Sequence, residues 1–582
     1  MRSWRSFRQQ VLPQREHQPG PATGKPPQPE PATEQRQEAA AAINRPEIPQ
    51  QRAPGPGSPR PAKRWRSLRQ PARYAALVAG AIPVLAFPAA NLEFLAWVAL
   101  VPGLALMRAA QARREAAVRG CWFGAGYILA AMYWLTPNIG PGLLLVAVTF
   151  GLLWSGVGVA VWSTLRQPVT WLRALAALVV VPSAWLVTEW IRSWQALGGP
   201  WAVYGASQWQ HPVILALAAV GGVWLITFAL VAANTGILLA IVARSMLLRG
   251  IGVAAAVAAV LVGPAAFALT APAAPVRPVT IALVQPGVTG TEGARVLRNE
   301  QLTAAQAGKS DLVVWGESSV GFDLRTDPAL LASIEHLSRH AGAQVLVDQD
   351  AVNPAGAQSK QATLISSAGI QGHYVKTRLV PFGEYIPFRS ALGWLDKISR
   401  AAPQNVQPGT GAHVMLATLP GGRDVTLGVL ICFESAFPDM SRVDADHGAQ
   451  VIVYQTSDST FQHSWAPAQH AALSAVRAAE TGRPTVQAAL TGDSAAFDAR
   501  GRQLAWAGTS FRGTLLVHLS VPPGSARTPF DRLGDYVPWT AVGVAGLAGL
   551  IGLRRGWRDR RIRPHRAGGL VAERVFSSIP QP

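Results

Sequence analysis

Three residues that could do chemistry together stand at the ends of short β-type runs in the second half of the chain. They are Glu317, Lys376 and Cys432. Strand ends are where α/β folds gather catalytic side chains. A thiol can act as a nucleophile, a carboxylate can carry protons, and an ammonium group can stabilise a developing negative charge. This set of residue types at strand ends favours a cysteine enzyme.

Each of the three also has an ordinary structural explanation when it is taken alone. A cysteine after an apolar run is usually a small core residue, a glutamate there usually caps a helix or is solvated, and a lysine is usually solvated. The chain has only six lysines, however, and one of them falls at a strand end. Three such coincidences in one region weaken the structural explanations. Lys360 and Lys397 lie outside these motifs, so we expect their Arg variants to behave like the wild type.

The framework for these residues is the region 275–525, where short β-type runs alternate with helix-compatible stretches. We expect strands at Val279–Gln285, Leu312–Trp315, Gln344–Val347, Thr363–Ser366, Thr426–Cys432, Gln450–Gln455, Thr485–Ala489 and Thr514–Leu519. We expect helices at Pro328–Ala341 and Ala466–Thr481. Alternating strands and helices of this kind predict a soluble α/β domain.

The preceding region is almost continuously apolar. Residues 74–270 contain no Lys and only three acids, and charged residues make up 14% of the whole chain, against about 25% in soluble domains. Because about 20 apolar residues span a bilayer, we expect about eight transmembrane helices. The predicted spans are 74–90, 92–109, 119–136, 142–164, 171–191, 213–243, 251–271 and 537–553.

The net charge of +20 is unevenly distributed. Residues 1–73 hold 14 Lys and Arg against 5 Asp and Glu, whereas residues 275–525 hold 19 against 20. The positive charge sits in tails and in loops beside apolar runs, which fits membrane orientation better than nucleic-acid binding. Eight spans with both termini cytoplasmic place the basic loops on one side, so the α/β domain is expected to be extracytoplasmic.

These observations predict five segments. Residues 1–73 form a disordered basic cytoplasmic tail, 74–274 a transmembrane domain, and 275–525 the catalytic domain. Residues 526–553 form a linker and a last transmembrane helix, and 554–582 a basic cytoplasmic tail. Within the transmembrane domain, Glu189 and Arg192 share one helix end. We interpret them as an i,i+3 ion pair rather than a functional site.

The motifs around the three strand ends resemble a known superfamily. The contexts W-G-E-S, Y-x-K-x-x-L-V-P-F-G-E-Y and G-V-L-I-C-F-E-S, in this order, resemble the carbon–nitrogen hydrolase (nitrilase) superfamily. The second context, the apolar spans and the run His470–Pro484 resemble its membrane-embedded member family, the apolipoprotein N-acyltransferases. The motifs Glu189–Arg192 and Gly198–Trp201 agree, and the resemblance covers roughly residues 74–555.

The resemblance implies a role for each residue. Cys432 would be the nucleophile, and Glu317 the general base and then the proton donor to the leaving alcohol. Lys376 would stabilise the oxyanion and lower the pKa of the cysteine. Supporting or substrate-binding positions fall on Glu384, Glu434 and Phe433.

The resemblance also implies a fold and a reaction. The catalytic domain would be an αββα sandwich in a multi-pass protein of the bacterial plasma membrane. An acyl chain would pass from a phospholipid to the cysteine as a thioester. It would then pass to the α-amine of a diacylglyceryl-modified N-terminal cysteine of an apolipoprotein. No cofactor, metal or nucleic acid is expected, and we expect a monomer.

The sequence departs from the family pattern at several positions. Gly316 stands where many members have Pro, Phe433 where Tyr is common, and Ser457–Phe461 replaces an Asn-Asp-x-Trp-Phe run. An early Lys-Trp pair is absent from Gly287–Asn299. Two alternatives remain at this point. One is a membrane-anchored amidase that uses the same three residues with water as acceptor, and the other is a non-catalytic scaffold.

Overall fold

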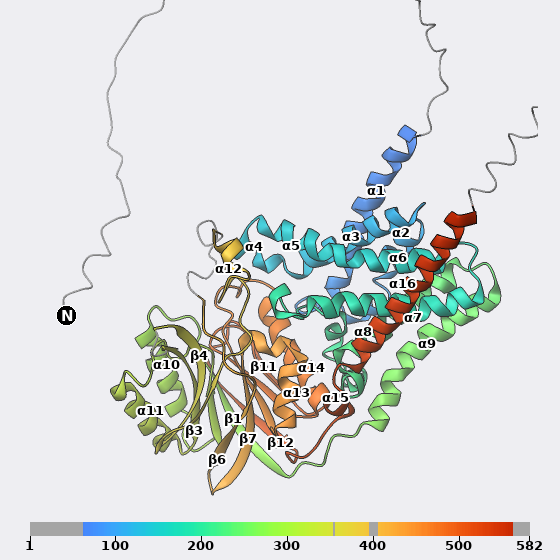
Figure 1. Ribbon diagram of the computed structural model, residues 1–582. Coiled ribbons are helices and arrows are strands. Elements are labelled where there is room, and N and C mark those ends of the chain that lie inside the picture. Colours follow the sequence, from blue (N-terminus) through green and yellow to red (C-terminus); the bar gives the residue numbers. More distant parts are fainter. Residues whose placement is uncertain (1–61, 353–355, 395–404, 563–582) are drawn as a thin grey trace, which may run out of the picture. The chain divides into compact units, whose positions relative to one another are not determined.

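The computed structural model describes residues 62–352, 356–394 and 405–562 (Figure 1). Most of both predicted tails and Lys397 lie outside the described residues. The described chain has a helical part, residues 62–269, followed by an α/β part and a last long helix. The first helix begins at Ala62, inside the stretch predicted to be disordered. It is held in part by Arg73, whose guanidinium lies 2.8 Å from the Glu115 carboxylate.

The helical part is built from long apolar helices and short connecting turns. Its helices are α1 (Ala62–Ala81), α2 (Val101–Arg108), α3 (Arg113–Ala131), α4 (Thr136–Ile139), α5 (Gly142–Gly151), α6 (Ser155–Leu165), α7 (Trp171–Arg192), α8 (Pro212–Val242) and α9 (Met246–Leu269). The last helix of the described chain, α16 (Tyr536–Ile562), packs against α7. Glycines allow close packing here: a Cβ on Gly126 of α3 would lie 1.9 Å from the backbone oxygen of Leu77 in α1.

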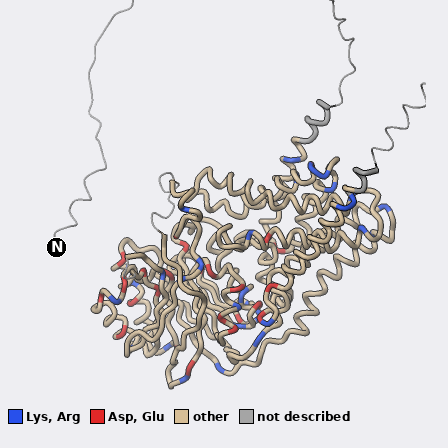
Figure 2. The backbone as a smooth tube through the Cα atoms, viewed as in Figure 1, with Lys and Arg blue, Asp and Glu red and all other residues tan. Residues whose placement is uncertain are grey.

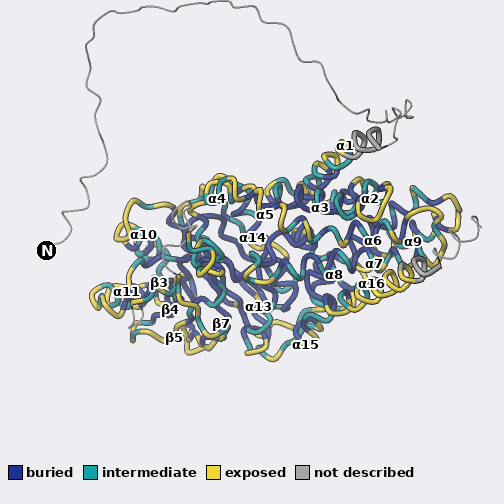
Figure 3. The backbone as a smooth tube through the Cα atoms, turned by 45° about the horizontal axis from the view of Figure 1, so that its top comes forward, coloured by how far each residue is buried: buried dark blue, intermediate teal, exposed yellow. Residues whose placement is uncertain are grey.

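Five helices of the described chain are long and apolar enough to cross a membrane. They coincide with the fourth to eighth predicted spans: Gly142–Leu165, Trp171–Arg192, Pro212–Val242, Met246–Leu269 and Tyr536–Arg555. α9 and α16 expose most of their residues, as Figure 3 shows for α16, which suits helices that face lipid.

The first three predicted spans differ from single apolar helices. α1 is apolar only near its end, and α3 carries four charged residues in its first two turns. The second span, 92–109, is interrupted, because a 3-10 turn (Glu93–Trp97) is separated from the eight-residue α2. The number of eight membrane-spanning helices therefore stays a prediction.

A kink divides the longest helix, α8, at Gly221 and Gly222. Gly222 has φ +69°, and a Cβ there would lie 2.7 Å from the ring of Phe530 in α15 (Pro529–Leu533). The kink frees the backbone N–H of Val223, which donates to the Glu480 carboxylate at 2.7 Å. Glu480 belongs to the α/β part, so the kink is also a point where the two parts are joined.

The α/β part contains two six-stranded sheets. The first has the order β12 (Gly513–Val521), β1 (Arg277–Gln285), β2 (Leu312–Trp315), β3 (Gln344–Val352), β4 (Gln358–Ser366) and β5 (Gly369–Val375). The second has the order β11 (Gln503–Ala507), β10 (Ser494–Phe497), β9 (Thr485–Ala489), β8 (Val451–Thr456), β7 (Arg423–Ile431) and β6 (Val414–Leu419). All eight strands and both helices expected from the sequence are present.

The two sheets pack face to face between helices. α10 (Glu292–Ala304) and α11 (Pro328–Ala341) lie against the first sheet, and α13 (Pro438–Asp446) and α14 (Ala466–Thr481) against the second (Figure 1). The predicted αββα sandwich is therefore confirmed. β5 was expected only as the β-type run that ends before Lys376, and β6, β10 and β11 were not expected. β5 and β6 are half-exposed edge strands, and β10 is a short Ser-Ala-Ala-Phe run without β-branched residues.

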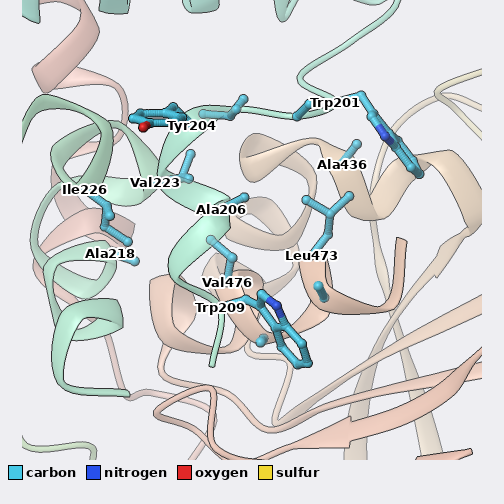
Figure 4. Close-up of a cluster of buried hydrophobic side chains, with 14 of the residues drawn as sticks. Trp201, Tyr204, Ala206, Trp209, Ala218, Val223, Ile226, Ala436, Leu473 and Val476 are labelled. Carbon is cyan, nitrogen blue, oxygen red and sulfur yellow. The ribbon is translucent and has the colours of Figure 1, made fainter. Parts of the chain in front are cut away.

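The helical part and the α/β part share one hydrophobic core. α14 packs on α8, and Trp201, Tyr204 and Val223 of the helical part lie in the same cluster as Leu473 and Val476 of α14 (Figure 4). A buried hydrogen bond crosses this contact, because Trp201 Nε1 donates to Gln469 Oε1 at 2.9 Å. The second sheet is thus fixed to the helical part through α14.

Candidate active site

The ends of three strands bring the predicted residues together. Glu317 follows β2, Lys376 follows β5, and Cys432 follows β7 of the facing sheet. Lys376 Nζ lies 2.9 Å from Glu317 Oε1 and 2.8 Å from Glu384 Oε1. The Cys432 thiol is hydrogen-bonded to the Glu317 carboxylate. The three residues predicted to act together therefore form one contiguous cluster.

Cys432 sits on a sharp turn between β7 and a short 3-10 helix, Cys432–Ala436. Its backbone has φ +52°, a conformation that non-glycine residues adopt at a cost of about 1–3 kcal/mol. Two contacts hold this turn. Glu434 Oε2 accepts a hydrogen bond from the backbone N–H of Ile431 at 2.8 Å, and His470 Nε2 donates to the Cys432 carbonyl at 3.0 Å. Cys432 as a whole residue is half-buried in this position.

Glu434 joins the nucleophile turn to the segment that follows Lys376. Its Oε1 accepts hydrogen bonds from Tyr374 Oη at 2.7 Å, from the N–H of Thr377 at 2.7 Å and from the N–H of Arg378 at 2.9 Å. The side chain is fully buried. Glu434 therefore fixes the ends of β5 and β7 relative to each other and does not reach the reacting atoms.

Glu384 and Phe433 line the same region in different ways. Glu384 holds Lys376 with Oε1 and accepts the backbone N–H of Val380 with Oε2 at 2.8 Å. Phe433 is buried edge-on against Phe437 with ring centroids 5.0 Å apart. A Cβ on Gly199 of the helical part would lie 2.7 Å from the ring of Phe433. The residue after the nucleophile thus contacts the helical part.

The electrostatics of the cluster define its resting protonation state. Burial acts to lower the pKa of Lys376, but the Glu317 and Glu384 carboxylates outweigh it and raise that pKa well above its ordinary value. Burial acts to raise the pKa of Glu317, but Lys376 and Lys360 outweigh it and lower that pKa. Before substrate arrives, the site therefore holds an ammonium group and a carboxylate.

The cysteine differs from the expectation drawn from the sequence. Burial and the Glu317 carboxylate raise the pKa of the Cys432 thiol well above its ordinary value, although Lys376 acts in the opposite direction. The thiol is therefore neutral at rest: Lys376 lowers its pKa as expected, but burial and the Glu317 carboxylate outweigh that effect. Since Glu317 is ionised and hydrogen-bonded to the thiol, it can accept the proton at the moment when sulfur attacks.

Sequence reasoning missed the two neighbours His470 and Asp458. His470 Nδ1 lies 3.0 Å from Asp458 Oδ1, and both side chains are buried. Burial acts to lower the pKa of His470, but Asp458 outweighs it and raises that pKa. His470 opens the run that carries the family resemblance, and Asp458 lies in the run Ser457–Phe461. Their partnership across a loop was not visible in the pattern.

The segment 198–204 of the helical part lies behind the nucleophile turn. It is held by Glu189, which accepts hydrogen bonds from Trp185, from Thr227 and from the N–H of Tyr204. Arg192 donates to the carbonyls of Trp201 and Ala202. The interpretation of Glu189 and Arg192 as an i,i+3 ion pair is therefore wrong, because both charges are used to hold this segment.

No group of three or more His, Cys, Asp or Glu side chains among the described residues is arranged to hold a metal ion. The polar groups of the site are instead paired with one another: carboxylate with ammonium, carboxylate with thiol, and imidazole with carboxylate. Such a cluster can relay one proton and hold one developing negative charge, which is what a covalent acyl transfer needs.

Comparison with known proteins gives matches along most of the chain. The family "Apolipoprotein N-acyltransferase N-terminal domain" matches residues 79–236, and the family "Carbon-nitrogen hydrolase" matches residues 280–523. The apolipoprotein N-acyltransferase of Geobacter metallireducens is 28% identical over 511 residues, which are 82% of this chain and 95% of that protein. That of Allorhizobium ampelinum is 31% identical over 422 residues, which are 66% of this chain and 76% of that protein.

Among solved structures, a carbon–nitrogen hydrolase from Helicobacter pylori is 15% identical. The match covers 49% of this chain and 95% of that one, with a TM-score of 0.33.

Proposed function

Because this chain belongs to the apolipoprotein N-acyltransferase family, we propose that it acylates apolipoproteins through a thioester on Cys432. The acyl donor is a phospholipid. The acceptor is the α-amine of a diacylglyceryl-modified N-terminal cysteine. The observation that carries this proposal is the contiguous cluster of a neutral thiol, an ionised carboxylate and a buried ammonium group.

In the first step, Glu317 takes the thiol proton while Cys432 Sγ attacks the carbonyl carbon of the phospholipid ester. The ammonium group of Lys376 has three N–H donors, and two of them are directed at Glu317 and Glu384. The third remains for the oxyanion of the tetrahedral intermediate. When the C–O bond breaks, Glu317 returns its proton to the leaving alcohol oxygen, so the products are a thioester and a lysophospholipid.

In the second step, the neutral α-amine of the acceptor attacks the thioester carbonyl. Glu317 takes a proton from the attacking nitrogen, and Lys376 again faces the oxyanion. When the C–S bond breaks, the thiolate recovers the proton from Glu317. The products are an amide on the acceptor and the free thiol of Cys432, so protons and electron pairs balance over the cycle.

We further propose that the chain is a monomer in a bacterial plasma membrane with about eight spans and both termini in the cytoplasm. The basic residues of the helical part lie mainly at its end remote from the sheets, and the sheets carry both charge signs (Figure 2). This separation supports an orientation in which the α/β part, residues 275–525, is extracytoplasmic. The segments 74–274, 526–553 and 554–582 keep the roles expected from the sequence, and 1–73 stays a basic cytoplasmic segment, although α1 begins within it at Ala62.

An amidase would use the same triad with water as acceptor. An assay with the purified protein in detergent and a phospholipid labelled in its acyl chain distinguishes the two functions. Two acceptor peptides are compared, one with a free α-amine on its diacylglyceryl cysteine and one with that amine acetylated. The proposal predicts label on the first peptide alone. Labelled free fatty acid, with neither peptide labelled, would contradict the proposal and support water as acceptor.

A further inference from the structure

A second lysine lies beside the proposed triad. Lys360 is on β4, next to β5 in the first sheet, and its backbone carbonyl accepts a hydrogen bond from the N–H of Lys376 at 2.9 Å. Its side chain is 21% exposed. Lys360 Nζ donates to Ser318 Oγ at 2.6 Å and forms an ion pair with Asp350. Lys360, which lies outside the motifs recognised in the sequence, is therefore tied into the site by its side chain.

The contact with Ser318 leads directly to the proposed general base. Ser318 follows Glu317 in the chain and has φ +53°, an unfavourable conformation for serine. Four contacts hold it there. Its N–H donates to Asp348 Oδ1 at 2.7 Å, and its carbonyl accepts from Arg295 at 2.6 Å. Its hydroxyl accepts from Lys360 and donates to Asp350 Oδ1 at 3.3 Å. The backbone that carries Glu317 is thus set in part by the Lys360 side chain.

We propose that Lys360 is a positioning residue for Glu317: it holds Ser318 in place and supplies a second positive charge that keeps the Glu317 carboxylate ionised before acyl transfer. This inference rests on the proposed role of Glu317 as general base. Lys360 touches neither the thiol nor the acyl group. It acts by orienting the carboxylate and by offsetting the unfavourable burial of its negative charge.

The charges that face Glu317 come from both sheets and from a helix. The positive groups are Lys376, Lys360 and His470, and the negative or neutral ones are Asp348, Asp350, Glu384, Asp458 and the Cys432 thiol. Lys376 is already shared between two carboxylates. Burial and the Glu317 charge raise the pKa of Asp348 well above its ordinary value, although Lys360 acts in the opposite direction. Lys360 is itself paired with Asp350, and its charge acts together with that of Lys376 to lower the pKa of the Glu317 carboxyl.

The test is the pH dependence of Cys432 reactivity, measured in a Cys121→Ser background so that one thiol remains. Two rates are followed against pH: acyl-enzyme formation from a labelled phospholipid, and alkylation of Cys432 by iodoacetamide, which needs no acyl donor. The variants are Lys360→Met, Lys360→Gln, Lys360→Arg, and Ser318→Ala, which keeps the charge but removes the link. Lys309→Met, at an exposed lysine, is the matched control.

The sign of the expected shift follows from the charge. Glu317 works as a base only when ionised, and removing a nearby positive charge raises the pKa of a carboxyl group. In Lys360→Met the acid limb of the plot of rate against pH should therefore move to higher pH by about one unit. At a fixed pH on that limb, the rate should be about tenfold lower than in the wild type. Lys360→Arg, Ser318→Ala and Lys309→Met should keep the wild-type midpoint, although Ser318→Ala should be slower at every pH.

The outcomes separate this inference from the proposed function. An unmoved acid limb in both rates for Lys360→Met would overturn the role of Lys360, whether or not the overall rate falls. If Lys360→Met does not fold, Lys360→Gln takes its place in the comparison. Absence of any acyl-enzyme in the wild type would contradict the proposed function instead. The alkylation profile would still report whether Lys360 controls the ionisation of Glu317.

Discussion

The indole ring of Trp201, in the helical part, lies 5.5 Å from the imidazole ring of His470, in the α/β part. His470 in turn donates to the carbonyl of Cys432. The unfavourable backbone conformation of the proposed nucleophile is thus supported by a residue that packs on a loop between two membrane helices. In this structure the helical part is therefore part of the framework of the candidate active site.

Replacing Trp201 with Phe should weaken this support. The variant keeps an aromatic ring against His470 but removes the N–H that donates to Gln469. A buried acceptor left without its donor costs about 1–3 kcal/mol. We expect a lower thermal midpoint and slower acylation of Cys432. Trp194→Phe, at a tryptophan that is 56% exposed, is the control and should change neither quantity. Equal behaviour of the two variants would argue against the contact.

Glu434→Gln should destabilise the protein more than its small change in shape suggests. The two carboxylate oxygens of Glu434 accept four hydrogen bonds. In the Gln variant an amide NH2 group replaces one of these oxygens, so a hydrogen-bond donor would face the existing donors. Breaking a buried polar network of this kind costs about 3 kcal/mol. Unfolding in detergent measures the change. Asp439→Asn, which removes a half-exposed ion pair with Arg378, should cost under about 1 kcal/mol. A similar loss in both variants would contradict the joining role of Glu434.

Lys376→Arg should nearly abolish acyl-enzyme formation. A guanidinium group keeps the charge but is planar and larger, so it cannot direct one compact donor to each carboxylate and one to the oxyanion. Loss of an oxyanion donor reduces the rate by about 10²–10³. Label from the phospholipid acyl chain is measured on the protein before any acceptor is added. Lys309→Arg is the control. Near-normal labelling of Lys376→Arg would remove this lysine from the catalytic set.

The proposed orientation can be tested with fused reporters. A reporter that is active only outside the cytoplasm should be active when inserted at Gly356, in the α/β part. It should be inactive when fused after Arg249, in the first turn of α9. The converse reporter, active only in the cytoplasm, should give the opposite pattern at the two sites. If the first reporter were active after Arg249 and inactive at Gly356, the orientation would be the reverse of the proposed one.

The sequence predicted those features that depend on local pattern. The β-type run Leu312–Trp315 gave β2 with its observed bounds, and α11 matched because Pro328 and Gly342 mark its ends. The features that were missed depend on register between distant segments. Lys360 reaches Ser318 because β4 pairs with β3, which in turn pairs with β2. The neutral state of Cys432 follows from its burial and from the Glu317 charge. Neither was visible in the spacing of residue types.

The most direct test of the account is mass spectrometry of the protein purified from membranes, with the acyl chain located by peptide mapping. The chain has only two cysteines, so Cys121 in α3 serves as an internal control. We predict a fatty acyl group on Cys432 that hydroxylamine removes at neutral pH, as a thioester requires, and none on Cys121. It should be absent from Cys432→Ser and Glu317→Gln and should disappear when the diacylglyceryl peptide is added. An acyl group on Cys121, or an unmodified Cys432 in a preparation that still acylates the peptide, would contradict the account.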